Sequence, residues 1–207
     1  MKHVVLFSGG MDSAAILLGR PKESTTALFF HYGQPHDAAE FGHAKRFTTM
    51  HDYTLRTELL PSLSGGICSG DSSPVVPGRN ALFLSFACSV AESMGAERVW
   101  IGCTRADREV FPDCRPRFLR SFNEMLAAAG VSVQVDAPLL MSSKRDVADL
   151  LRARGGDPAE TWSCYHPQPM PKSTRAQPCG ECGACLARAG VRIPTPRLDN
   201  LRKRLMR

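Results

Sequence analysis

The stretch that decides the fold, residues 4–13, reads VVLFSGGMDS. Its first four residues form an apolar, β-branched run that predicts a buried strand, and a helical pattern extends from Asp12 to Leu18. Between them, Gly9 and Gly10 let the main chain approach an anion closely, and successive N–H groups form a concave set of donors. The stretch therefore predicts a phosphate-binding loop, with a tight turn capped by Ser or Asp as the alternative.

The rest of the chain continues the alternation of strand and helix. The hydrophobic pattern predicts strands at residues 26–30, 53–58, 98–103 and 131–135, and helices at residues 37–50, 81–94, 116–129 and from a capping box at Ser143 to Gly155. We expect Asn80 to cap the helix at residues 81–94, which is apolar on almost every side and should be buried. Residues 60–79 read as a long loop. Such alternation predicts an α/β fold with a doubly wound, mostly parallel sheet that binds ligands beyond the carboxyl ends of its strands.

Length and composition exclude several classes of protein. A chain of 207 residues with 43% hydrophobic and 22% charged residues suits one ordinary α/β domain and is neither disordered nor fibrous. Its longest charge-free apolar stretch, residues 81–91, is far shorter than the roughly 20 residues of a membrane-spanning helix. We therefore expect a cytoplasmic protein without a membrane partner.

The last quarter of the chain departs from this composition. Residues 151–207 carry 11 Lys and Arg against 4 Asp and Glu, whereas residues 1–150 carry 15 against 16, so the formal charge of +6 comes from the tail. A basic, cysteine-rich tail raises the alternative of a zinc knuckle that binds nucleic acid. Because its basic residues have few aromatic neighbours, a solvated terminus is the favoured interpretation, and nucleic acid is not expected as a direct partner.

Residues 8–13, SGGMDS, resemble the SGGxDS signature of the PP-loop ATP pyrophosphatases, which use ATP to adenylate an oxygen and release pyrophosphate. The spacing fits neither G-x-x-x-x-G-K-[ST] nor G-x-G-x-x-G, which excludes the usual kinase-like and dinucleotide sites. Further segments resemble one branch of that superfamily, the QueC-type 7-cyano-7-deazaguanine synthases. They are HYGQPHDAAE (31–40), VPGRN (76–80), FPDCR (111–115), PLLMSSK (138–144) and TWSCY (161–165).

This resemblance implies an enzyme of queuosine biosynthesis, a carbon–nitrogen ligase that converts 7-carboxy-7-deazaguanine and ammonia to the nitrile in two ATP-driven steps through an amide. Adenylation provides AMP as a leaving group where oxide could not leave, first from the carboxylate and then from the amide oxygen. The alternatives are a divergent relative that stops at the amide or amidates another carboxylate, and a sulfur-using tRNA-modifying relative. The chain has no room for the RNA-binding domain that the last one usually needs.

The resemblance also implies roles for residues in the matched segments. ATP with Mg²⁺ is expected at Leu6, Phe7, Ser8, Gly9, Gly10, Met11, Asp12, Ser13, Ala14, Ala15 and Ile16. The residues implied in catalysis are Asp12, Asp113, Arg115 and Lys144, and those implied in substrate binding are Arg79, Asn80, Asp113 and Arg115. Ordinary surface charges or a helix cap are the alternatives for the substrate residues. A homodimer is the expected assembly.

Five positions depart from the family pattern. His31 stands where an acidic residue is usual, and Pro35 where a basic residue is common. Thr104 replaces an expected Asn, Val110 an expected Gly and Phe111 the usual Tyr. Thr104 and Val110 lie in the segment assigned to substrate recognition. The sequence therefore supports adenylation by ATP more directly than it supports the identity of the acid that is adenylated.

Four cysteines form a predicted metal site: Cys164, Cys179, Cys182 and Cys185. Tetrahedral Zn²⁺ prefers four soft ligands, and the two-residue gaps with Gly180 and Gly183 let a turn direct thiolates at one centre. Disulfides and an iron–sulfur cluster are the alternatives. We expect one structural zinc in a C-terminal subdomain, residues 158–207, beside an ATP-binding catalytic domain, residues 1–157. Trp162 either packs beside this site or stacks on a flat heterocycle, and packing is favoured.

Overall fold

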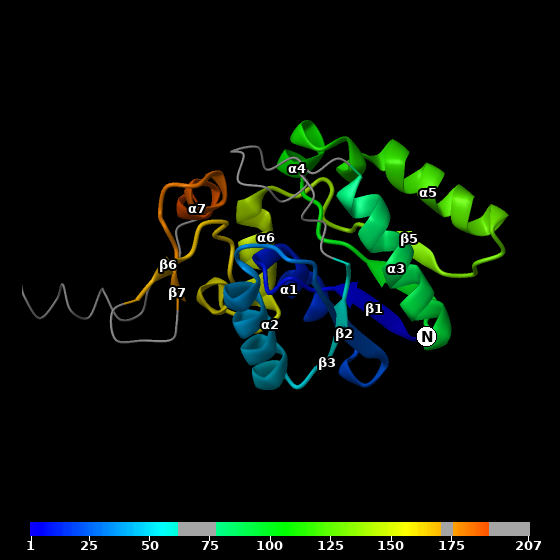
Figure 1. Cartoon of the computed structure of the whole chain (residues 1–207), viewed down its shortest axis with the longest axis horizontal. Helices are drawn as coiled ribbons and strands as arrows, with labels where there is room; N and C mark the ends of the chain where they lie inside the picture. Colours follow the sequence, from blue (N-terminus) through cyan, green and yellow to red (C-terminus); the bar gives the residue numbers. More distant parts are fainter. Residues whose placement is uncertain (62–77, 171–175, 191–207) are drawn as a thin grey trace, which may run out of the picture.

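The computed structural model describes residues 1–61, 78–170 and 176–190 (Figure 1). In this part of the chain the main sheet has five strands, all parallel, in the order β3-β2-β1-β4-β5. They are β1 (His3–Leu6), β2 (Thr25–His31), β3 (Thr54–Leu59), β4 (Arg98–Trp100) and β5 (Gln134–Asp136). The predicted doubly wound, parallel α/β architecture is confirmed. Most of the predicted loop at residues 60–79 lies outside the described residues.

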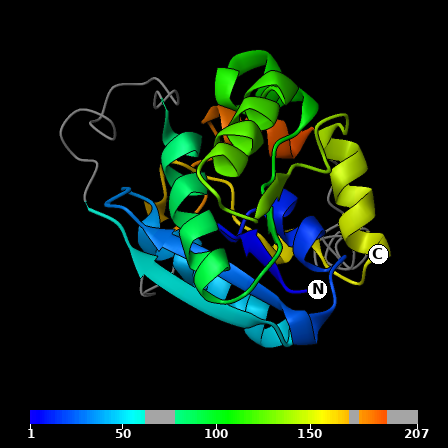
Figure 2. The same ribbon diagram turned by 90° about the vertical axis from the view of Figure 1, so that its right-hand side faces the viewer.

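Helices cover both faces of this sheet (Figure 2). They are α1 (Met11–Leu17), α2 (Asp37–His51), α3 (Arg79–Ser93), α4 (Arg105–Val110), α5 (Pro116–Ala128), α6 (Lys144–Ala153) and α7 (Gly183–Ala189). A two-stranded antiparallel ribbon, β6 (Gln168–Pro169) with β7 (Ala176–Gln177), precedes α7 in the cysteine-rich region. Among the described residues, no helix combines the length and the apolar character that crossing a bilayer requires.

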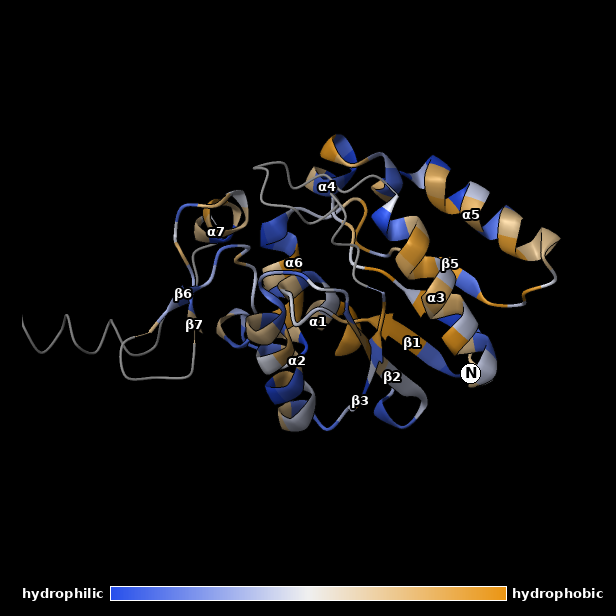
Figure 3. Cartoon of the chain, in the orientation of Figure 1, coloured by the Kyte–Doolittle hydropathy of each residue, from blue (hydrophilic) through white to orange (hydrophobic). Residues whose placement is uncertain are grey.

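The apolar residues of β1 show why the sheet has two covered faces (Figure 3). Successive side chains of a strand point to opposite sides. Val4, fully buried, joins Leu84 of α3 in one hydrophobic cluster, and α5 belongs to the same side. Val5, also fully buried, joins Ile16 of α1 and Leu151 of α6 in the second cluster. A central parallel strand that is apolar on both faces is typical of this architecture.

Two expectations about α3 are wrong. The helix begins at Arg79, so Asn80 lies within its first turn and does not cap it; the cap position is Gly78, with a φ of 73° in the left-handed region where glycine is favoured. Nor is the helix buried all round, because the ring of Phe86 is 40% exposed. One face of α3 packs on the sheet, whereas the other is exposed. Because the helix is apolar on almost every side, the sequence pattern does not distinguish these two faces.

Other element boundaries differ from the predicted ones for local reasons. The strands expected at residues 98–103 and 131–135 are shorter, since β4 ends at Trp100 and β5 begins at Gln134. The helix α4, of sequence RADREV, was not expected, because it has no apolar stripe to mark it. The capping box at Ser143 is confirmed: its hydroxyl accepts from the Asp146 main-chain N–H at 3.2 Å, and the Asp146 carboxylate accepts from the Ser143 N–H at 2.8 Å.

The strand order fixes where a ligand site can lie. From β1 the chain proceeds outward to β2 and β3, and then returns to the other side of β1 to form β4 and β5. The loops that follow β1 and β4 therefore diverge and leave a crevice between them, the position at which open α/β sheets bind ligands. The loop at residues 8–13 follows β1, and Thr104 and α4 follow β4.

Candidate functional site

The loop at residues 8–13, which we call the phosphate loop, is held in a shape that requires glycine. Gly9 has a φ of 75°, and a Cβ atom there would lie 2.9 Å from both the Glu40 carbonyl oxygen and the Ala44 nitrogen of α2. Any side chain at this position would meet main-chain atoms that cannot move aside. The cap position of α1 is Gly10, without a side-chain hydrogen bond, so the alternative of a turn capped by Ser or Asp is wrong.

Asp12, in the first turn of α1 beyond the carboxyl end of β1, forms an ion pair with Lys144. The Lys144 Nζ is 2.5 Å from Asp12 Oδ2 and 3.7 Å from Asp107 Oδ2. A Cβ atom at Gly102 would lie 3.1 Å from the Asp12 Cβ, so the absence of a side chain after β4 makes room for Asp12. The other carboxylate oxygen, Asp12 Oδ1, is buried and has no hydrogen-bond partner among the described residues. A buried carboxylate oxygen without a partner is costly unless a ligand satisfies it.

The charges around Asp12 depend on one another. Burial raises the pKa of Asp12, and the Lys144 ammonium opposes that shift. Burial acts to lower the pKa of Lys144, but the Asp12 and Asp107 carboxylates outweigh it and hold the pKa above its ordinary value. Lys144 therefore stays charged, and its ammonium group interacts with both the Asp12 and the Asp107 carboxylate. Removing Lys144 would leave Asp12 and Asp107 without their shared cation.

Asp107 is a member of this group that the sequence analysis missed. It closes a capping box at the start of α4, accepting from the Thr104 main-chain N–H at 2.8 Å and from the Thr104 hydroxyl at 2.5 Å. The spacing Thr104-x-x-Asp107 equals the spacing recognised at Ser143, so the cap itself could have been predicted. Its approach to Lys144, at the start of α6, depends on β4 lying beside β5, which the sequence does not state.

The remaining predicted residues lie apart from this ion pair. Asp113 receives the Asn80 main-chain N–H at 3.1 Å on Oδ2, and the Asn80 side-chain amide donates to the Asp113 carbonyl at 3.4 Å. Arg115 is exposed, and its Nε donates to the carbonyl of Arg108 in α4 at 3.1 Å. The structure thus joins Asp12 with Lys144 and Asp113 with Asn80, whereas Arg115 bonds to α4.

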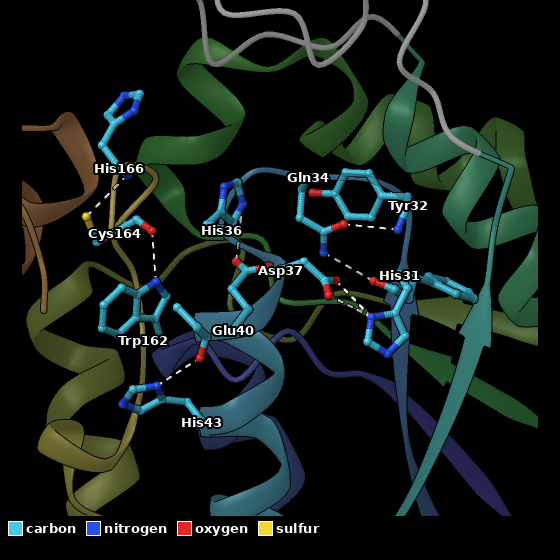
Figure 4. A network of polar contacts seen from close by, with 12 residues as sticks. His31, Tyr32, Gln34, His36, Asp37, Glu40, His43, Trp162, Cys164 and His166 are labelled. Atoms are coloured by element: carbon cyan, nitrogen blue, oxygen red, sulfur yellow. Dashed lines mark hydrogen bonds and ion pairs between the residues drawn. The ribbon is translucent and has the colours of Figure 1, made fainter. Parts of the chain in front are cut away.

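His36 and Glu40, in the first turn of α2, form a half-buried pair beside the phosphate loop (Figure 4). The His36 Nε2 lies 3.6 Å from Glu40 Oε1, and the two side chains are 12% and 15% exposed. Burial raises the pKa of Glu40 to about 8, although Gln34 and the Arg79 guanidinium act against that shift. Burial lowers the pKa of His36 to about 4, and Arg79 adds to the shift. At neutral pH the pair therefore carries a protonated carboxyl and a neutral imidazole.

The four predicted cysteines converge on one point. Their Sγ atoms all lie within 4.8 Å of one another, with 3.5 Å between Cys164 and Cys179 and 3.9 Å between Cys179 and Cys185. Four sulfurs at about 2.3 Å from a tetrahedral zinc would lie about 3.8 Å apart, so the residues fit such an ion. Main-chain N–H groups of Glu181 and Cys182 point at Cys179 Sγ and lower its pKa to about 6, which favours the thiolate.

The departures from the family pattern have local structural partners. Thr104 is fully buried as the α4 cap, a role in which Asn and Thr are both favoured. The His31 Nδ1 lies 2.9 Å from the Asp37 carboxylate, so an imidazole contacts an acidic residue there. Val110, the last residue of α4, is 57% exposed.

Comparison with known proteins agrees with this geometry. The family model described as "Queuosine biosynthesis protein QueC" matches residues 2–66 and 68–191. A 7-cyano-7-deazaguanine synthase from Psychromonas ingrahamii is 34% identical in an alignment of 208 positions that covers 90% of each chain. The Rhodopirellula baltica 7-cyano-7-deazaguanine synthase is 36% identical over 91% of this chain and 86% of its own, and the Microcystis aeruginosa one is 35% identical over 97% and 98%.

Solved structures agree at the level of the fold. The U34-tRNA thiolase NcsA of Methanococcus maripaludis has a TM-score of 0.51 and 16% identity over 99% of this chain and 66% of its own. The NMN synthetase of Francisella tularensis has a TM-score of 0.50 and 19% identity over 74% and 61%. With the PP-loop-type fold, the matched motifs and relatives at 34–36% identity together, the chain belongs to the QueC family of queuosine biosynthesis proteins.

Proposed function

We propose that the protein is an ATP-dependent 7-cyano-7-deazaguanine synthase whose adenylation site is the crevice above Asp12. The observation that carries the proposal is the buried Asp12 carboxylate, with one oxygen on Lys144 and the other without a partner among the described residues. An orphaned carboxylate oxygen beside a phosphate loop suits a divalent cation such as the Mg²⁺ that accompanies ATP. Asp12 would hold that cation, and Lys144 would meet the charge that develops on the phosphates.

The reaction that follows from this site has two rounds. In the first, a carboxylate oxygen of 7-carboxy-7-deazaguanine attacks the α-phosphorus of ATP; a P–O bond forms and pyrophosphate leaves. Ammonia then displaces AMP and gives the amide, with loss of one proton. In the second round the amide oxygen attacks another ATP, pyrophosphate leaves and the nitrogen loses one of its two protons; loss of AMP and of the remaining N–H proton then gives the nitrile. The net reaction consumes two ATP and one ammonia for each nitrile.

The acid would lie between the phosphate loop and the segments that follow β2 and β4. The charge of Arg79 contributes to the pKa shifts of His36, Glu40 and Tyr165. Its guanidinium therefore provides a cation near these side chains. We assign Arg79 to the carboxylate of the acid or to phosphate, and Asp113 with Asn80 to the polar edge of the heterocycle. Arg115, which bonds to α4, would have to move to take part.

Three companion proposals complete this function. The metal of the cysteine cluster is zinc, because four thiolates at tetrahedral spacing suit it and the nitrile chemistry requires no electron transfer. The enzyme works as a homodimer in the cytoplasm, where reducing conditions keep its thiols free. The division into residues 1–157 and 158–207 stays a prediction, and the basic residues after Gly190 lie outside the described residues.

One assay tests the central proposal. The protein, ATP, Mg²⁺, ammonium and 7-carboxy-7-deazaguanine are incubated, and the products are identified by mass. We expect the nitrile, with two AMP formed for each molecule of product. An amide that accumulates with one AMP would support the divergent relative that stops early. Loss of neither ATP nor acid would contradict both versions.

A further inference from the structure

We propose that Trp162 is a positioning residue that holds the phosphate loop in place relative to the cysteine cluster, so that metal binding at the cluster governs ATP affinity. The proposal rests on the proposed function only in taking the phosphate loop to be the ATP site. Such a link explains why a cluster of four cysteines accompanies a reaction that uses no thiol.

On the side of the loop, the contact is a main-chain hydrogen bond. The Trp162 N–H donates to the Gly9 carbonyl at 2.8 Å. Gly9 is confined on its other side, where the Glu40 carbonyl and the Ala44 nitrogen of α2 would lie 2.9 Å from a Cβ atom. The phosphate loop is therefore held at Gly9 between α2 and Trp162, and Gly9 loses this hydrogen bond if Trp162 moves.

On the side of the cluster, the contact is made by the indole. The Trp162 Nε1 donates to the Cys164 carbonyl at 2.8 Å. Trp162 is 4% exposed and belongs to one hydrophobic cluster with Cys164 and Cys185. Figure 4 shows the bond between the indole and Cys164. Because one residue bonds to Gly9 through its main chain and to a cluster cysteine through its ring, it links the two sites without an intermediate.

Neighbouring contacts keep this link from swinging. The His43 ring of α2 lies against the indole, with ring centroids 4.9 Å apart and planes inclined by 35°. Arg188, on the same helix as Cys185, donates to the hydroxyls of Thr161 at 3.0 Å and Ser163 at 3.1 Å, the residues on either side of Trp162. The segment is thus tied to α7 as well as to the phosphate loop. A metal that fixes Cys164 and Cys185 fixes both ties.

The first test compares two Trp→Phe variants of the metal-loaded protein. Trp162→Phe keeps the main-chain N–H but removes the indole hydrogen bond to Cys164, and we expect the KM for ATP to rise by about tenfold. The KM for 7-carboxy-7-deazaguanine should change less than twofold. Trp100→Phe is the matched control, because Trp100 is the other tryptophan and its indole also donates one hydrogen bond, to His3 Nδ1 at 3.4 Å. A merely structural role would lower the melting temperature in both variants without a selective change for ATP.

The second test uses Trp100→Phe protein, in which Trp162 is the single tryptophan. Zinc is removed with a chelator and restored, while tryptophan emission, circular dichroism and ATP binding by calorimetry are recorded. We expect emission to shift to longer wavelength and ATP to bind at least tenfold more weakly in the stripped protein, with both changes reversed by Zn²⁺. If the stripped protein loses its fold, the metal-loaded Trp162→Phe protein decides the matter.

Failure of this inference is distinguishable from failure of the proposed function. Calorimetry with ATP alone needs no acid substrate, so a protein that binds ATP but leaves 7-carboxy-7-deazaguanine untouched would contradict only the proposed reaction. Unchanged ATP affinity in folded, metal-free protein, or an equal ATP effect in Trp162→Phe and Trp100→Phe, would overturn the role of Trp162.

Discussion

The crevice above Asp12 and the cysteine cluster differ in whether their polar atoms already have partners within the protein. In the crevice, Asp12 keeps one buried oxygen without a partner among the described residues, while its other oxygen is held by Lys144. In the cluster, the four sulfurs already converge on a common centre and two of them receive main-chain N–H groups. The first arrangement suits a ligand that enters and leaves, and the second suits one that stays. A buried group left unsatisfied is therefore a better sign of turnover than a satisfied one.

The largest expected effect is on the cluster. Cys182→Ser replaces a soft thiolate by a hydroxyl, and we expect loss of the metal and a fall of at least about 4 kcal/mol in the unfolding free energy. Elemental analysis and urea unfolding measure the two quantities. Cys88→Ala, a buried cysteine on α3, is the control and should keep the metal. Full metal content in Cys182→Ser would show that the cluster does not use all four sulfurs.

The second effect separates chemistry from stability in the crevice. Asp12→Asn removes the charge but keeps the size of the side chain, and we expect ATP–pyrophosphate exchange to fall by about 10²–10³-fold. The unfolding free energy should change little, because Lys144 retains Asp107. Asp149→Asn, which removes an exposed partner of Arg152 on α6, should leave exchange unchanged. Equal exchange in both variants would remove Asp12 from the reaction.

A third effect concerns the pH dependence of stability. Since the pKa of Glu40 is raised from 4.5 to about 8, the folded protein holds an extra proton in that range, and stability falls as pH rises. His36, whose pKa is lowered from 6.5 to about 4, gives the opposite slope between those values. These two slopes cancel between about pH 4.5 and 6.5. From pH 6.5 to 8 Glu40 acts without His36, against the opposite slope of Cys179, whose pKa is lowered from 9.0 to about 6. In this range the Glu40 contribution to the unfolding free energy should fall by up to about 1.4 kcal/mol per pH unit.

Urea unfolding at pH 6.5 and 8.0 measures this slope. The slope should be more positive by up to about 1.4 kcal/mol per pH unit in Glu40→Gln than in the unchanged protein, whereas Glu124→Gln, at an exposed position on α5, should leave the slope unchanged. A slope of the same size in the Glu40→Gln protein would mean that another group titrates in this window.

The smallest effect tests a departure from the family pattern. Thr104→Asn restores the family residue at a helix cap, and since Asn and Thr both cap well, the unfolding free energy should change by less than about 1 kcal/mol. The ratio of nitrile to amide should stay the same. A changed product ratio would make position 104 part of substrate recognition.

The sequence predicts the sheet well because each strand is marked by its own apolar run, whereas α4, which has no apolar stripe, was not predicted. The phosphate loop and the cysteine cluster are also local, being short motifs whose residues lie close together in the chain. The pairing of Asp107 with Lys144, and the burial of Glu40, depend on elements that meet only in space. The start of α3 was misplaced because Asn80 resembles a cap, whereas its main-chain N–H binds Asp113.

The strand order also bears on how such an enzyme diversifies. The phosphate loop follows β1, while the five departures from the family pattern fall elsewhere: His31 and Pro35 at the end of β2 and just after it, and Thr104, Val110 and Phe111 after β4. A change of acceptor would thus need substitutions only in the neighbouring loops and none in the loop after β1. In such a fold, the loop that binds ATP can be inherited unchanged while the substrate that is adenylated changes.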